Sequence, residues 1–464
     1  RETSDVAQAD WDSAAFMPDG SIDPSRFRIQ APTSEACGRC HGYAQSRQPE
    51  LRDWNVTARQ TETTGQLYVG GRISDSTLNV AHRSALGRPW DVHAERLLTC
   101  SDCHFATNDP GNALRTGAAQ PQHLIHEVRT IALGDFLRRP SHEFAKGHSS
   151  QGTVANALDG TMRRCEGCHD APKVHRFLPK AERHLAQVAC ETCHIEQVHT
   201  PARRVTDYSV IDERGEPRVE YRGIQADNLD EPAAYLTGYE PLLLRRIDSD
   251  GTRRLFPYNV VTSFYWVIDD PKGQRPASVE LLKFALYERP GAAAQLKELL
   301  DRNHDGEVAP EERVLSSAKG VEEVRTLLVA AGAKNPRLVG EMQPFGIHHG
   351  VAPARLALRD CAHCHSREAP LAASFQLAAR SPYGVIPTLV GDSSVVPSFR
   401  IRATSGGELL LEPNLAASGL HVFGLSRTRW LDWAGLGAVV SVFLTALGHG
   451  GLRLWSRRKR KESV

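Results

Sequence analysis

The spacing of apolar and polar residues changes along this chain, and the changes predict where strands and helices lie. Residues 203–268 contain β-rich apolar runs that are broken by the turn sequences ERGEP and DSDGT, so we expect one or two hairpins there. Residues 278–300 and 320–331 place apolar side chains at helical spacing and predict helices.

An apolar stretch near the C-terminus, residues 433–454, contains no acidic residue. As a helix it would span about 33 Å, which is roughly the thickness of a bilayer core. Trp430 and Trp433 lie at one end, Trp455 lies at the other, and the basic run RRKRK follows. This arrangement is typical of a membrane-spanning helix with a cytoplasmic basic tail, residues 455–464, and a periplasmic body. The alternative is a buried core helix.

All the cysteines of the chain belong to five copies of one pattern, C-x-x-C-H. In that pattern two thiols form thioethers with a porphyrin, and the following histidine ligates the iron. Structural zinc would need a further pair of ligands for each motif, and a redox dithiol would not need the histidine. The sequence therefore predicts five covalently bound haem c groups. The attachment cysteines are Cys37, Cys40, Cys100, Cys103, Cys165, Cys168, Cys190, Cys193, Cys361 and Cys364. The proximal iron ligands are His41, His104, His169, His194 and His365.

The positions of the motifs predict how the chain is organised. Four motifs lie in the first 199 residues, which leaves room for little besides short helices and loops around the porphyrins. Cys165 and Cys190 are only 25 residues apart, so we expect the third and fourth haems to be adjacent. Covalent haem attachment takes place outside the cytoplasm and indicates the periplasm. The expected fold is mostly α, with long loops around five haems, minor β hairpins and one C-terminal transmembrane helix.

We expect four parts along the chain. They are a four-haem N-terminal domain (1–200), a β-hairpin and helical region with an EF-hand-like loop and the fifth haem (201–432), the transmembrane helix (433–454) and the basic tail (455–464).

Fifteen histidines remain beyond the five proximal ones, enough to give every iron a sixth ligand. A histidine close to a motif in sequence cannot easily reach the far face of that motif's own haem, so we expect it to ligate a neighbouring haem. The histidines in such positions are His93, His142, His175, His184 and His349. Weaker candidates are His82, His126, His148, His199 and His348.

The sequence DRNHDGEVAPEE fits the twelve-residue EF-hand loop, with Gly306 at the sharp turn. Hard oxygen ligands at this spacing suit calcium in a structural role. The expected ligands are Asp301, Asn303, Asp305, Glu307 through its backbone carbonyl, and Glu312. The alternative is a solvated acidic turn between two helices.

Four segments resemble multihaem cytochromes c of the octahaem tetrathionate reductase type. They also resemble the multihaem halves of membrane-bound quinol-oxidising complexes, in which the c-type domain precedes a cytochrome b. The segments are WDVHAERLLTCSDCHFATNDP, HEFAKGHSSQGTVANALDGTMRRCEGCH, RHLAQVACETCHI and IHHGVAPARLALRDCAHCHS. In such proteins the histidine ahead of each motif is commonly an axial ligand, which the resemblance implies for His93, His142, His184 and His349.

The chain also departs from these families. It has five motifs rather than eight, and no motif carries lysine in place of its histidine, as one does in the pentahaem nitrite reductases. A catalytic haem with an open face is therefore not indicated, and we predict no catalytic residue.

The charge distribution and the end of the apolar stretch indicate the partners. The net charge is +1, but the tail is basic, and the remainder, with its haem propionates, is acidic, which argues against nucleic acid. The segment GHGGLRLW resembles the region that leads into the cytochrome b half of the quinol-oxidising complexes. Its His449 and Arg453 are either interfacial residues or part of a haem b or quinone site shared with a separate membrane subunit.

Together these patterns predict an electron-transfer subunit of an oxidoreductase complex in a respiratory chain. We expect it on the periplasmic side of the bacterial inner membrane, crossing the bilayer once, with a cytoplasmic C-terminus. It would relay electrons between a membrane-embedded cytochrome b or other quinone-reactive subunit and a periplasmic electron carrier or reductase. One alternative is a multihaem reductase of a small sulfur or nitrogen oxyanion, and another is a haem-binding scaffold without redox traffic.

Overall fold

The structure is a computed structural model that describes part of the chain. The described residues are 14, 17–19, 91–93, 98–104, 162–225, 235–248, 251–271, 273–426 and 429–462. The first motif, Cys37–His41, lies outside the described residues, as do the expected ligand His142 and the weaker candidates His82, His126 and His148.

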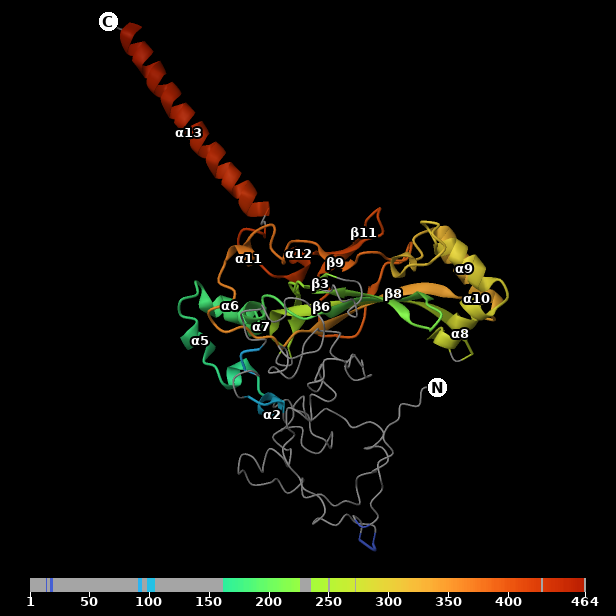
Figure 1. Cartoon of the computed structure of the whole chain (residues 1–464). Coiled ribbons are helices and arrows are strands. Elements are labelled where there is room, and N and C mark those ends of the chain that lie inside the picture. Colours follow the sequence, from blue (N-terminus) through green and yellow to red (C-terminus); the bar gives the residue numbers. More distant parts are fainter. Residues whose placement is uncertain are drawn as a thin grey trace.

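A seven-stranded sheet forms the centre of the described chain (Figure 1). Its path runs β10–β8–β6–β1–β2, and β5 and β7 also pair with β6. The strands are β1 (Ala202–Ile211), β2 (Pro217–Arg222), β5 (Leu242–Ile247), β6 (Arg253–Asp270), β7 (Gly273–Pro276), β8 (Arg337–Gly346) and β10 (Thr388–Leu389). Strand β6 organises the sheet, because it pairs in parallel with β1 and antiparallel with β5, β7 and β8.

The sequence predicted one or two hairpins in this region, and two are present, β1–β2 and β5–β6. The prediction of a mostly α fold with minor hairpins is nevertheless not met, because strands and helices contribute about equally to the described residues. The reason is that β6 continues to Asp270 and pairs with β8 and β1, which are distant in sequence. Local apolar spacing reveals a hairpin but not such long-range pairing.

A helical lobe covers one end of the sheet (Figure 1). It contains α8 (Val279–Lys283), the π-helical turn η11 (Phe284–Glu288), α9 (Ala292–Leu300), the 3₁₀ turn η12 (Pro310–Glu312) and α10 (Ala318–Ala330). The expected helices at 278–300 and 320–331 are therefore confirmed, with a break near Pro290. The lobe packs Leu282, Leu286 and Leu328 against Trp266 of β6. Each fully buried side chain of this size stabilises the fold by about 1.5–3 kcal/mol.

A second sheet, of three strands, lies against the first. It contains β9 (Phe375–Ala378), β11 (Phe399–Ala403) and β12 (Leu409–Pro413), in the order β11–β12–β9. Leu377 and Leu411 from this sheet share a core with Phe256, Tyr258 and Phe264 from β6. The short strands β3 (Ile224–Gln225) and β4 (Tyr235–Leu236) form a separate pair.

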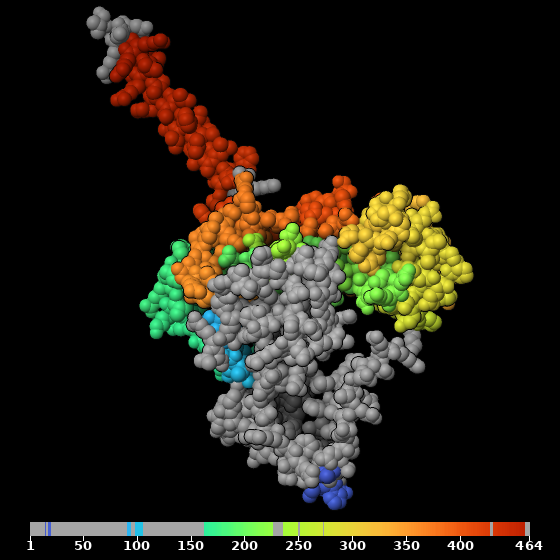
Figure 2. All heavy atoms as spheres, viewed as in Figure 1, coloured from blue at the N-terminus to red at the C-terminus, as the bar shows by residue number. Residues whose placement is uncertain are grey.

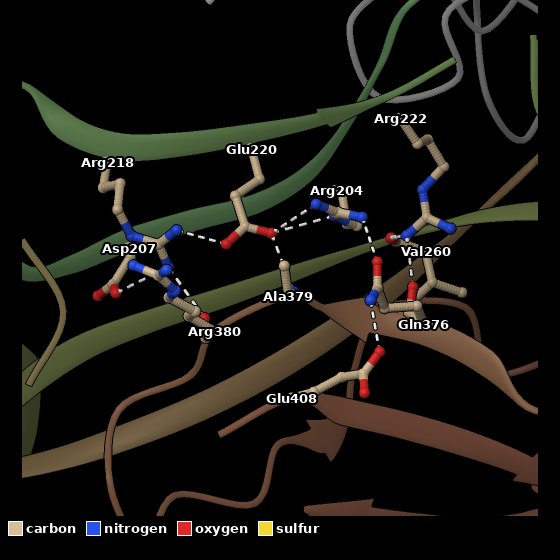
Figure 3. Close-up of polar contacts among 10 residues, drawn as sticks. All are labelled: Arg204, Asp207, Arg218, Glu220, Arg222, Val260, Gln376, Ala379, Arg380 and Glu408. Carbon is tan, nitrogen blue, oxygen red and sulfur yellow. Dashed lines mark hydrogen bonds and ion pairs between the residues drawn. The ribbon is translucent and has the colours of Figure 1, made fainter. Parts of the chain in front are cut away.

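A buried ionic network crosses the interface between these two sheets (Figure 3). Arg218 forms ion pairs with Asp207 at 3.4 Å and with Glu220, and Arg204 pairs with Glu220 at 2.9 Å. The backbone N–H of Ala379, next to β9, donates to Glu220 at 3.1 Å. The carboxylates on β1 and β2 are thus neutralised by neighbouring arginines while they hold the second sheet in place.

The four motif segments that the structure describes contain only short helices, which the motif spacing predicted for the first 199 residues. They are α2 (Cys100–Cys103), the 3₁₀ turn η10 (Cys165–Gly167), α5 (Ala171–Val174), α6 (Ala181–Gln187), α7 (Cys190–His194) and α11 (Ala362–His365). They lie towards the end of the central sheet that is opposite the helical lobe (Figure 1).

The chain ends in α13 (Arg429–Glu462), which follows the short α12 (Leu415–Ser418) and stands clear of the other described parts (Figures 1 and 2). Residues 430–459 are long and apolar enough to cross a membrane, and none of that apolar window is buried against the protein. The expected span, 433–454, lies inside this helix. The helix also continues into the expected basic tail.

Candidate functional site

Each of the four motif histidines that the structure describes lies opposite a second histidine. The distances between ring centroids are 5.7 Å for His104–His349, 6.0 Å for His169–His93, 6.1 Å for His194–His175 and 6.2 Å for His365–His184. In every pair the second histidine is one of the five that the sequence indicated as distal ligands. The remaining motif histidine and the remaining candidate, His41 and His142, lie outside the described residues.

These separations fit a single metal ion held between two imidazoles. A metal bond to a histidine nitrogen is about 2.0 Å long and that nitrogen lies ~1.2 Å from the ring centre, so two rings on opposite sides of one ion have centres about 6 Å apart. Each motif histidine also follows two cysteines, and among the described residues no two cysteines form a disulfide. The donor set of every described motif is therefore two thiols and two imidazoles, which fits a covalently attached, six-coordinate haem.

Hydrogen bonds to Nδ1 fix the orientation of several of these rings. His175 Nδ1 donates to the carbonyl of Ala171 at 2.9 Å, and His184 Nδ1 donates to the carbonyl of Lys180 at 3.2 Å, each one helical turn back. His365 Nδ1 donates to the carbonyl of a residue far along the chain, Phe423, at 2.9 Å. A proton held on Nδ1 leaves Nε2 as the nitrogen that can bind a metal.

The carboxylate of Asp91 orients the ring of His93 and also binds the backbone that follows His349. Its carboxylate lies 3.5 Å from His93 Nδ1 and accepts hydrogen bonds from the backbone N–H groups of Gly350 and Val351, both at 2.9 Å. Burial alone would raise the pKa of Asp91, but the hydrogen bonds outweigh it and lower the pKa to about 2. Next to this contact, burial lowers the pKa of His349 to about 4, so that its ring is neutral.

The third and fourth motifs are in direct contact, as their short spacing predicted. The thiols of Cys165 and Cys190 are neighbours, and their interaction raises the pKa of Cys165 and lowers that of Cys190. The ligand histidines of the two motifs are also neighbours, because His169 acts electrostatically on His194.

The second and fifth motifs extend this pair at its two ends. At one end the backbone N–H of Arg163 donates to the carbonyl of Cys103 at 3.0 Å, and Cys168 is an electrostatic neighbour of Cys103. At the other end burial raises the pKa of Cys193 to about 12, and the neighbouring Cys364 contributes further. The four described motifs thus follow one another in a single row, in the order α2, η10, α7 and α11.

The sheet and the chain beyond it hold this row in position. The backbone N–H of Ala189 and the hydroxyl of Thr192 both donate to the carbonyl of Leu255 in β6, at 3.0 and 2.9 Å. The N–H of Ala352 donates to the carbonyl of His194 at 2.7 Å, which brings the segment of His349 to the fourth motif.

The two weaker candidates within the described residues have different surroundings. His348 lies 3.4 Å from Glu191 and packs against the ring of Phe256, with centroids 4.8 Å apart. His199 lies beside Gly238. Neither of these contacts is with a motif histidine.

The loop at residues 301–312 has the backbone turns expected of an EF-hand. The carboxylate of Asp301 accepts from the N–H of Gly306 at 3.0 Å, and Asn303 and Asp305 accept from the N–H groups two residues on, at 2.9 and 2.8 Å. Gly306 has a φ of 88°, which favours glycine. Asp301 Oδ1 is buried and has no hydrogen-bond partner.

Glu312, the last residue of this loop, binds backbone N–H groups instead. Glu312 accepts from the N–H groups of Arg302, Asn303 and Ala309, at 3.0, 3.3 and 3.1 Å. Within the described ranges, no three His, Cys, Asp or Glu side chains converge as a metal-binding group. Calcium at this loop therefore stays a prediction.

Sequence reasoning missed three contributors to the site: Asp91, the carbonyl of Phe423, and Arg245, whose guanidinium bridges α6 and α12. No sequence signal marks them, because each acts through a contact between segments that are distant along the chain.

Comparison with known proteins gives one similar structure. No protein-family model and no curated protein matches the chain. Among solved structures the chain is similar to the octahaem cytochrome c from Shewanella oneidensis, at 18% identity and a TM-score of 0.33. The similarity covers 73% of this chain and 64% of that one, so the chain spans less than two thirds of that protein. At this level of similarity, the function of the chain has to be inferred from its own residues.

Proposed function

We propose that this protein is a pentahaem cytochrome c that carries electrons between a quinone-reactive membrane protein and a periplasmic electron carrier or reductase. One observation carries the proposal. Every motif histidine within the described residues has a second histidine at 5.7–6.2 Å, the separation that suits one iron between two imidazoles.

The ligands follow from these pairs. The two cysteines of each motif would hold a haem covalently, and the paired histidines would ligate its iron from both faces. The proposed axial pairs are His104 with His349, His169 with His93, His194 with His175, and His365 with His184. His142 is the remaining strong candidate, so we assign it to His41. Haem c supplies one-electron chemistry when bound, and the chain supplies the ligands, their orientation and the close spacing of the groups.

The pairing favours an electron carrier over a reductase. An iron with two imidazole ligands has no open position at which a substrate could bind. None of the four motifs that the structure describes leaves its histidine unopposed. The reductase alternative would need one haem with a single protein ligand.

The exposed apolar helix α13 supports the membrane part of the proposal. Trp433, Phe443 and Leu447 are 71%, 67% and 68% exposed, which is costly in water but favourable in lipid. Basic residues at the end of α13 support, by the positive-inside rule, the proposal that this end is cytoplasmic and the remaining chain periplasmic. His449 and Arg453 near that end would meet the membrane-embedded partner.

We also propose a structural calcium ion at the loop 301–312. Its support is the set of EF-hand turns and the buried, unpartnered Oδ1 of Asp301. On binding, Glu312 would exchange hydrogen bonds to the backbone for the ion.

The ligand assignment can be tested with one variant and a matched control. Replacing His175 with methionine should change one low-spin haem signal and raise the reduction potential of that haem, because thioether ligation favours ferrous iron. His348→Met, in a histidine that faces Glu191 rather than a motif histidine, should leave all haem spectra unchanged. Electronic and EPR spectra during a redox titration measure both effects. An unchanged spectrum in His175→Met would contradict the assignment.

A further inference from the structure

The last part of the chain before α13 is bonded directly to the ligand of the fifth motif. The ring of His365 donates from Nδ1 to the carbonyl of Phe423 at 2.9 Å. Phe423 is six residues before Arg429, the first residue of α13, and six residues span about 20 Å at full extension. His365 therefore lies close to the point where the membrane helix begins.

The attachment site of the fifth motif packs against the same segment. Cys364 shares an apolar cluster with Leu420, Val422 and Leu425. The packing is tight, because a Cβ added to Gly424 would lie 3.1 Å from the carbonyl oxygen of His365, and Gly424 has a φ of 87°.

The opposing ligand is tied to this segment as well. Arg245 donates from Nη1 to the carbonyl of Ser418 at 2.7 Å and from Nη2 to Gln187 at 2.8 Å. Gln187 lies on α6, the helix that carries His184. Both histidines of the pair His184–His365 are thus linked to the chain that leads into α13.

The motif at the other end of the row has no such link to α13 within the described residues. Figure 1 shows α11 near the start of α13 and α2 at the far end of the described motifs. Geometric contacts give the same order. Leu358, just before α11, donates its backbone N–H to the carbonyl of Cys193 in α7 at 2.9 Å. His175, just after η10, faces His194 of α7, and Arg163, just before η10, donates to the carbonyl of Cys103 in α2 at 3.0 Å.

We infer that the fifth motif, Cys361–His365, is the membrane-facing end of the row and the place where the quinone-reactive membrane partner exchanges electrons with this chain. The motif at Cys100–His104 lies at the opposite end of the described row and is directed towards the periplasmic partner. This inference rests on the proposed function.

The surface beside the fifth motif suits a position at the bilayer. Phe423 is 84% exposed, and Trp430 and Trp433 follow it within ten residues at 68% and 71% exposure. Tryptophan side chains are enriched at membrane interfaces. At the partner, oxidation of one quinol to quinone releases two protons and two electrons, and this chain would pass the electrons on one at a time. If electrons flow in the opposite direction, the partner reduces one quinone to quinol with two electrons from this chain and two protons.

The test measures the distance of individual haems from the membrane surface. The full chain is placed in lipid nanodiscs, with or without a lipid that carries a gadolinium chelate on its headgroup, and the relaxation of each low-spin ferric haem signal is measured by EPR. His184→Met identifies the signal that belongs to His365, and His349→Met identifies the signal that belongs to His104. We expect the gadolinium lipid to accelerate relaxation of the His365 signal several-fold more than that of the His104 signal.

An equal or larger effect on the His104 signal would overturn the inference and leave the electron-carrier function intact. If neither variant alters a low-spin signal, the ligand pairs are wrong and the inference falls together with the proposed function.

A second variant identifies the same signal without removing a ligand. Gly424→Ala forces a side chain against the carbonyl of His365 and should shift the His365 signal alone. Its control, Gly435→Ala, lies on α13 where an added Cβ meets nothing within 4 Å, and it should shift no haem signal. A Gly424→Ala protein whose His365 signal stays unchanged would show that the segment before α13 does not contact this haem ligand, and would overturn the inference.

Discussion

The central sheet and the motif segments of this protein are held together in different ways. In the sheet, Phe256, Tyr258, Phe264 and Trp266 of one strand are each at most 1% exposed and pack against neighbouring strands and helices. In the motif segments, which are residues 98–104, 162–195 and 348–365, the helices contain at most seven residues. Helices this short are unstable alone. The sheet supplies its own core, whereas the proposed haems would provide the core of the motif segments.

The largest expected effect comes from a variant that cannot attach one of the proposed haems. Replacing both Cys190 and Cys193 with alanine should abolish covalent attachment at α7, the motif that bonds to β6. We expect amide protection from hydrogen exchange to be lost across residues 162–195 and retained in β6 and β8, because local stability depends on local burial. Hydrogen–deuterium exchange by mass spectrometry measures this. Equal loss of protection in the sheet would show that the two regions form one cooperative unit.

The next largest effect is expected within the sheet region. Glu220→Gln removes the charge between Arg218 and Arg204 in the buried network, which leaves these arginines without their shared partner (Figure 3). Breaking a buried ion pair costs about 3–5 kcal/mol. Denaturant unfolding followed by near-UV circular dichroism measures the loss. The control is Glu412→Gln, in a more exposed pair with Arg402, where we expect less than about 1 kcal/mol. Equal effects in the two variants would contradict a structural role for the buried network.

The same carboxylate predicts an acid dependence. Burial alone would raise the pKa of Glu220, but the positive charges of Arg218 and Arg204 outweigh it and lower the pKa below its usual 4.5. Its contribution to stability is therefore present above pH 4.5 and is lost as the pH falls through the lowered pKa. Stability measured against pH should decrease less steeply below pH 4.5 in Glu220→Gln than in the native protein. If the stability of the two proteins changed with pH in parallel, the titration of Glu220 would not contribute to the acid dependence.

The smallest of these effects concerns the helical lobe. If the loop 301–312 binds calcium at about one hundred times its dissociation constant, the ion stabilises the lobe by about 2.7 kcal/mol. Chelation should then lower the melting temperature of the native protein and leave the double variant Asp301→Ala/Glu312→Ala unchanged. Glu311→Ala, in an exposed neighbouring side chain, should behave like the native protein. A native protein without calcium, and with a melting temperature that chelators do not change, would show that the loop is only a turn.

The parts of the molecule that could be predicted are those encoded by residues close together in the sequence. The motifs, the two hairpins, the helices of the lobe and the apolar C-terminal helix all occupy continuous stretches of sequence. Histidines near the motifs could be named as ligand candidates, but their pairing could not be predicted. His349, for example, lies opposite His104, although it precedes the fifth motif in sequence. Strand β8 was missed for the same reason, because its pairing with β6 depends on residues that are distant along the chain.

The central claim is that each haem iron is held between two histidines, so that the chain carries electrons rather than binding a substrate. Its most direct test is low-temperature EPR of the fully oxidised, full-length protein, combined with a haem count by mass spectrometry. Five covalent haems with only low-spin ferric signals are the predicted result. A stoichiometric high-spin signal would reveal an iron with an open position, contradict the claim and favour the reductase.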